Sequence, residues 1–159
     1  PYHPFDLVAS PDGTRVYLAN QAEGLSYIET AGYSFVGPVI EEADKLYLRL
    51  EVSPDSAYIF AVTVNVRNWQ SGLTIIDAVD FSIVGTLDIT GPYQWLSFNG
   101  IDIHPTRDEL YLIYSDTAGL GLPDFYVIDI SDPAAPAVSS TLTTGTHDDI
   151  YGELLIIRP

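Results

Sequence analysis

The chain has 159 residues and a formal net charge of −16, which disfavours binding to nucleic-acid phosphates and to anionic lipid headgroups. Hydrophobic residues make up 47% of the chain, which argues against disorder, yet no apolar run is long enough to span a bilayer, so we expect no membrane insertion. Cysteine is absent, which excludes disulfides and thiolate metal sites.

The first predicted elements are two short antiparallel strands within residues 5–20. Apolar and polar residues alternate on both sides of a Ser-Pro-Asp-Gly turn at residues 10–13, which is typical of a tight hairpin. The same unit recurs around Pro54 and Pro105, and residues 155–159 match its beginning. The four prolines stand 43, 51 and 54 residues apart, a repeat length typical of β-propeller blades.

Three positions of this unit have the same character in each full copy. Apolar residues stand four and two places before the proline, and a large aromatic residue stands six places after it. These residues are Leu7, Ala9 and Tyr17, then Leu50, Val52 and Phe60, then Ile101, Ile103 and Tyr111. The repetition predicts that the three copies fold alike.

Two further strands, at residues 24–29 and 34–40, complete a first predicted blade over residues 5–40. Pro38 cannot donate a ladder hydrogen bond, which favours the outermost edge of the sheet for this fourth strand. An acidic connection at residues 41–45 leads to the second blade.

The second and third predicted blades span residues 48–87 and 99–142, and a further blade begins at residues 152–159. No window sustains helical periodicity. The sequence therefore predicts an all-β fold, a β-propeller of about three four-stranded antiparallel blades plus the first strand of a fourth.

The repeats also resemble known propeller families. Residues 5–20 resemble a repeat of the YVTN family of β-propellers, and residues 125–136 resemble the related LVIVD repeat. The second copy departs from the pattern, because Ser56 and Ala57 replace the Gly-Thr of the turn, which weakens the prediction of a turn there. Such propellers are surface-layer and adhesion modules, lactonase-like enzymes or subunits of redox enzymes, so the resemblance implies an extracellular or cell-surface location.

Three blades do not close a ring, because propellers have four to eight. The two terminal blades would each turn an apolar face to water, which is unusual for a stable monomer. We therefore expect these faces to be covered either by remaining blades of the same propeller or by further copies of the chain.

The longest connections all fall at one end of the predicted blades. They are residues 65–71, 88–98, 115–123 and 143–151. This end is the candidate binding surface, with a protein or carbohydrate as possible ligand. Its notable residues are Trp69, Tyr93, Trp95, His147, Asp148 and Asp149. Exposed indoles would anchor a partner or stack on a sugar, whereas indoles folded back would only cover neighbouring blades.

Candidate ligands for a cofactor are few. His147, Asp148 and Asp149 could bind a divalent cation such as calcium, or the carboxylates could simply cap backbone turns; no other cofactor is predicted. Glu51 and Asp102 stand at matching places on two innermost strands, where they could act as an acid/base pair.

Other polar residues have structural interpretations. The strand-end carboxylates Glu29, Asp77 and Asp129 are expected to accept hydrogen bonds in the following turns, and His104 is expected to be a solvent-facing turn residue. Motifs for a catalytic nucleophile or a phosphate loop are absent. The first hypothesis is thus a non-catalytic binding or structural module. The alternative is a lactonase-like hydrolase or redox-enzyme propeller subunit with its site at the central channel mouth.

Overall fold

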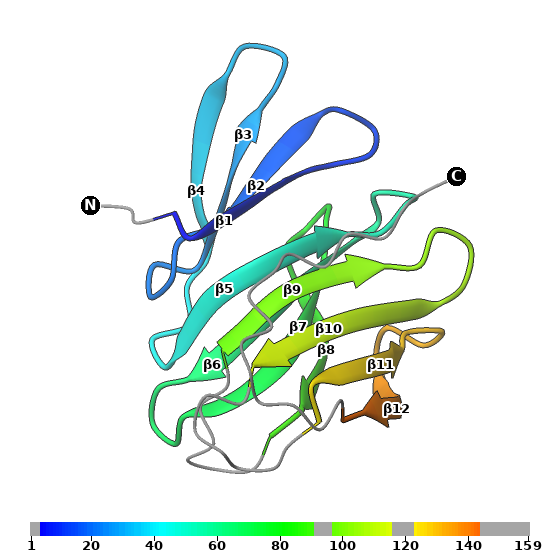
Figure 1. Ribbon diagram of the computed structural model, residues 1–159. Helices are drawn as coiled ribbons and strands as arrows, with labels where there is room; N and C mark the ends of the chain where they lie inside the picture. The colour runs from blue at the N-terminus through cyan, green and yellow to red at the C-terminus, as the bar shows by residue number, and fades with distance from the viewer. Residues whose placement is uncertain (1–3, 91–96, 116–122, 144–159) are drawn as a thin grey trace.

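The computed structural model describes residues 4–90, 97–115 and 123–143, which form three four-stranded antiparallel sheets (Figure 1). Blade 1 contains β1 (Asp6–Ala9), β2 (Arg15–Ala19), β3 (Leu25–Glu29) and β4 (Ser34–Ile40). Blade 2 contains β5 (Lys45–Val52), β6 (Tyr58–Asn65), β7 (Gln70–Asp77) and β8 (Ile83–Asp88). Blade 3 contains β9 (Ser97–Ile103), β10 (Glu109–Ser115), β11 (Phe125–Asp129) and β12 (Ala137–Leu142). In every blade the strands are neighbours in chain order, which confirms the predicted all-β architecture.

The first strands of the blades lie side by side, with β5 between β1 and β9 (Figure 1). The Asp6 carboxylate joins blades 1 and 2, since its Oδ2 accepts a hydrogen bond of 2.9 Å from the backbone N–H of Leu50. At the opposite edges lie β4, β8 and β12. Pro38 is in β4, so the predicted edge position of this proline is confirmed.

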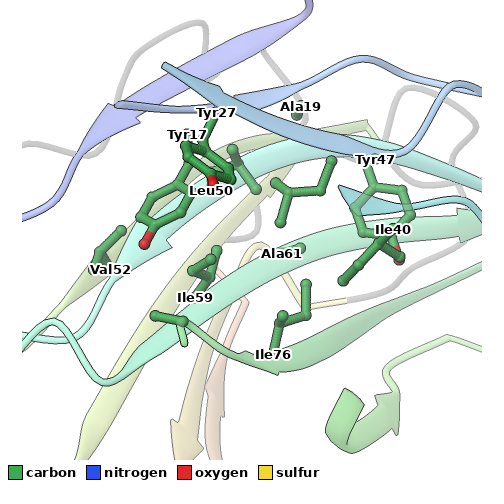
Figure 2. Packing of buried hydrophobic residues seen from close by; sticks show 12 residues of the cluster. Tyr17, Ala19, Tyr27, Ile40, Tyr47, Leu50, Val52, Ile59, Ala61 and Ile76 are labelled. Carbon is green, nitrogen blue, oxygen red and sulfur yellow. The ribbon is translucent and has the colours of Figure 1, made fainter. Parts of the chain in front are cut away.

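Two separate apolar cores hold the blades together. One core lies between blades 1 and 2, and the close-up in Figure 2 shows side chains from both sheets meeting there. The other lies between blades 2 and 3. Strand β6 serves both cores, because Ile59 and Ala61 face blade 1 whereas Phe60 and Val62 face blade 3. This alternation follows from the two-residue period of a strand.

The repeated positions have a constant direction. Leu50 and Ile101, each four places before a proline, pack toward the preceding blade, where they are buried. Tyr17 and Phe60, each six places after a proline, pack toward the following blade. Leu7 has no described preceding blade to pack against and is 64% exposed. The apolar residues of each repeat are therefore placed to pack between two neighbouring blades.

The turn of the second copy is as regular as the first, despite its different residues. Asp12 Oδ1 accepts hydrogen bonds from Ser10 Oγ at 2.6 Å and from the Thr14 backbone at 2.9 Å. In the second copy Asp55 Oδ1 accepts in the same way, from Ser53 Oγ at 2.6 Å and from the Ala57 backbone at 3.0 Å. Ser56 adopts a φ of 60°, close to the 73° of Gly13. The turn is therefore present in the second copy, although Ser56 and Ala57 depart from the pattern.

Some strands are longer than the sequence predicts. Strand β5 begins at Lys45 rather than residue 48, and β9 begins at Ser97. The segment at residues 65–71 is shortened to a turn at residues 66–69, because β6 continues to Asn65 and β7 begins at Gln70. The predicted start of a further blade, at residues 152–159, lies outside the described residues. Within the residues described, no helix is long and apolar enough to cross a membrane.

Candidate functional site

A groove of about 500 Å³ lies between blades 2 and 3, at the end where short turns join β5 to β6, β9 to β10 and β11 to β12. Three segments and two strand residues line it. The residues are Ser53, Pro54, Asp55, Tyr58 and Phe60 from blade 2, and Ile103, His104, Pro105, Thr106, Arg107, Asp108, Ile130, Ser131 and Pro133 from blade 3. Its volume is that of a small-ligand or side-chain pocket. We name it the blade 2–3 groove.

The blade 2 wall carries a carboxylate that stays ionised. Asp55 accepts hydrogen bonds from Ser53 and from the backbone of Ala57, and these hold the pKa of the carboxyl below its usual value, with the Ser53 bond as the largest cause. The Ser53 hydroxyl also accepts a 2.9 Å hydrogen bond from the Tyr58 backbone at the start of β6. One hydrogen-bonded turn thus fixes both the negative charge and an aromatic residue of the groove.

The blade 3 wall is built by the turn between β9 and β10. His104 Nδ1 accepts hydrogen bonds from the backbone N–H groups of Thr106, at 3.1 Å, and Arg107, at 3.0 Å. The Arg107 guanidinium lies 3.0 Å from the Glu109 carboxylate and donates a 2.7 Å hydrogen bond to the Tyr111 hydroxyl. Its charge is therefore balanced within blade 3. His104 is a turn residue, as expected, although it is half-buried rather than fully exposed.

The end with the long connections is described only in part. Trp69 lies in the hairpin between β6 and β7, 40% exposed and with a φ of 52°. Its strained left-handed backbone places a large apolar ring at the surface. The other predicted binding residues lie outside the described part of the chain: Tyr93, Trp95, His147, Asp148 and Asp149. Their roles stay predictions.

The two carboxylates considered as an acid/base pair, Glu51 and Asp102, are not brought together. Glu51 is opposite Phe60 across the sheet and so faces blade 3, whereas Asp102 is opposite Tyr111, on the side of blade 3 turned away from blade 2. Each accepts a hydrogen bond from the next residue's backbone N–H, at 3.0 Å and 2.8 Å. Side chains at equivalent positions of successive blades face the same way around the propeller. The sheet of blade 3 therefore lies between Glu51 and Asp102.

Two of the strand-end carboxylates have the structural role expected of them. Asp77 Oδ1 accepts a 2.7 Å hydrogen bond from the Val79 backbone, and Asp129 Oδ1 accepts a 2.9 Å bond from Ser131. Over residues 4–90, 97–115 and 123–143, no group of three or more acidic or histidine side chains could hold a metal ion.

The blade 2–3 groove was not predicted from the sequence, because the length of the connections directed the prediction to the opposite end of the blades. The available signal was the difference between copies: Tyr58 stands four places after its proline, where the first copy has Arg15. A long loop is easier to notice in a sequence than a side chain missing from a boundary.

Acid titration should reveal the contribution of the Asp55 turn. Because the folded-state pKa is lowered, the charge stabilises the fold above the unfolded pKa, near 3.9, and this stabilisation disappears as the pH falls through the folded pKa. We expect Asp55→Asn to lower the free energy of unfolding by about 0.5–1 kcal/mol at pH 7, a figure discounted for solvent screening, and by less below about pH 4. Urea unfolding at pH 7, 4 and 3 measures it.

Asp88→Asn is the control for that titration, since it makes the same charge change on an exposed side chain at the end of β8. A difference between wild type and Asp55→Asn that stays constant from pH 7 to pH 3 would contradict the assignment.

The chain matches no protein-family model, and no curated protein matches it. Among solved structures it is similar to the crystal structure of RRP9 WD40 repeats, with a TM-score of 0.67 and 16% identity over 93% of this chain and 40% of that one. It is also similar to the structure of U3-55K, with a TM-score of 0.64 and 15% identity over 89% of this chain and 39% of that one.

These similarities, together with the three radially arranged sheets, define the fold as a β-propeller segment. At such low identity they show the fold alone. The chain spans about two fifths of the length of these two solved structures.

Proposed function

We propose that the chain is a non-catalytic β-propeller interaction module whose outer faces, on blades 1 and 3, join further blades. One observation carries the proposal: Leu7 is 64% exposed, whereas its repeat equivalents Leu50 and Ile101 are only 4% and 9% exposed between blades. A residue that is buried at a blade boundary in two copies is uncovered in the third.

The outer face of blade 1 is apolar across all four strands. Leu7 is opposite Leu18, and a second row crosses the sheet from Ala9 through Val16 and Ile28 to Phe35. Phe35 is 47% exposed. A contiguous apolar strip of this kind is characteristic of an interaction surface. On blade 3, Tyr111 has the repeat position that packs toward a following blade in the other two copies; it is 9% exposed and lies against the rings of His104 and Phe125.

Either remaining blades of the same propeller or a second copy of the chain would cover the outer faces of blades 1 and 3. The longer solved structures support the first alternative, because this chain covers only about two fifths of them. A chain tested without such blades should associate with its own copies, since the same rows of residues on another copy then offer an apolar partner.

The mass of the 159-residue chain in solution tests the proposal. We expect sedimentation to show assemblies heavier than 17.4 kDa, because association between copies buries the exposed apolar face. Combining Leu7→Glu with Phe35→Glu should shift the mass toward the monomer by charging the blade 1 face.

Val79→Glu serves as the matched control, because Val79 is 78% exposed in the turn after β7 and is not on that face. A wild-type chain that stays folded and monomeric up to about 100 µM would contradict the proposal.

The partner surface and the location belong to the same proposal. We place a protein or carbohydrate partner at the long-connection end, where the exposed Trp69 ring supports an anchoring role for the indole. The resemblance to YVTN repeats and the net charge of −16 support an extracellular or cell-surface protein. Calcium binding by residues 147–149 stays a prediction.

A further inference from the structure

The boundary between blades 1 and 2 is filled at its short-turn end by one arginine. The Arg15 guanidinium carbon lies 4.8 Å from the ring centroid of Tyr27 and 5.6 Å from that of Phe81. Its Nη1 also donates a 2.6 Å hydrogen bond to the backbone oxygen of Ala78. The two rings are themselves stacked, with centroids 5.4 Å apart. A guanidinium on aromatic rings with a carbonyl acceptor is a favourable arrangement for arginine.

The boundary between blades 2 and 3 lacks this filling. Tyr58 stands four places after Pro54, as Arg15 does after its own proline, and Pro133 takes the place of Phe81 four residues after the strand-end aspartate. Ile130 corresponds to Ala78 in the same alignment and lines the groove. Without an internal guanidinium, the blade 2–3 groove of about 500 Å³ remains at this place.

The groove offers chemistry suited to a guanidinium from outside. Tyr58 supplies aromatic surface, and Asp55 and Asp108 supply negative charge. The opposing charge of Arg107 is balanced by Glu109, as described above. The chain as a whole, at −16, also attracts cationic partners over longer distances.

We propose that the blade 2–3 groove binds an arginine side chain of a partner protein, whose guanidinium takes the place that Arg15 occupies at the first boundary. This inference rests on the proposed function, because it names the chemistry of a partner for an interaction module. It assigns that partner to the short-turn end, apart from the long-connection surface. Arginine is preferred over lysine because a planar guanidinium stacks on rings and donates in several directions, whereas an ammonium is a hydrated point charge.

The test uses the full 159-residue chain and two capped pentapeptides that differ only by arginine or lysine at the central position. Titrations followed by backbone amide NMR shifts report both affinity and place. We expect the arginine peptide to bind about tenfold more tightly than the lysine peptide and to shift amides of the three turns that line the groove.

Three variants locate the site. Tyr58→Arg places an arginine at the position equivalent to Arg15, so that its own guanidinium fills the groove. This variant should abolish the amide shifts caused by the arginine peptide. Asp108→Asn removes one charge from the exposed rim and should weaken binding about threefold. Asp88→Asn makes the same charge change at the end of β8 and should leave binding unchanged. If Tyr58→Arg fails to fold, Asp108→Asn and its control still decide the question.

Equal affinity for the two peptides would overturn the proposal, because charge alone would then explain binding. Undiminished binding by folded Tyr58→Arg, or by Asp108→Asn, would overturn it as well. None of these results affects the mass of the assembly, which tests the proposed function separately.

Discussion

Replacing Gly24 by alanine is expected to lower the free energy of unfolding by about 3–5 kcal/mol. Gly24 precedes β3 with a φ of 77°, and a Cβ there would lie 1.8 Å from the backbone oxygen of Ile40 and 2.8 Å from its carbonyl carbon. Backbone atoms cannot rotate away as a side chain can. Relief of the clash requires the end of β4 to separate from β3, which opens the blade 1–2 core at Ile40. Urea unfolding followed by circular dichroism measures the loss.

Gly13→Ala separates the clash from the backbone strain. Gly13 has nearly the same φ, 73°, but no atom lies within 4 Å of the position its Cβ would take. This control should therefore cost only the left-handed penalty of about 1–2 kcal/mol. If both variants lose the same stability, close approach at Gly24 has no role in holding blade 1 together.

The positions of the strands could be predicted because they depend on local signals. Alternating apolar residues around each proline specify a hairpin, and Pro38 indicates an edge strand whatever the tertiary structure is. Because the same signals recur in each repeat, the hairpin predicted for the first copy also applies to the second and third. Asn65 and Gln70 are polar and were assigned to a loop, yet they continue β6 and β7 because strand length also depends on pairing across the hairpin.

The candidate site could not be predicted in the same way, because it depends on what two different blades place against each other. Whether a boundary is filled is decided by Arg15 in one case and Tyr58 in the other, and neither residue looks unusual within its own strand. The acid/base pair considered for Glu51 and Asp102 does not form for a related reason. The two residues match in sequence register, but register within a blade does not determine whether side chains of different blades converge. Long loops attracted attention because length is visible without a structure.

The neighbouring residues Ile59 and Phe60 are expected to report on different blade boundaries. Both are fully buried in β6, but Ile59 belongs to the core shared with blade 1 and Phe60 to the core shared with blade 3. Phe60→Ala should cost about 3–5 kcal/mol and Ile59→Ala about 2–5 kcal/mol, since each leaves a cavity that the sheets cannot close. Global unfolding alone cannot distinguish the two variants.

Hydrogen exchange of backbone amides does distinguish them. In a repeat architecture each unit is stabilised mainly by its nearest neighbours, so a weakened boundary frees the blade beyond it. Phe60→Ala should speed exchange in β10 and β11 while β2 and β3 stay protected, and Ile59→Ala should do the reverse. Equal acceleration in all three blades for both variants would mean that the sheets unfold as one cooperative unit. In that case the separate cores would be a geometric feature without energetic independence, and blades 1 and 3 would be stabilised by the whole chain rather than by the adjacent boundary.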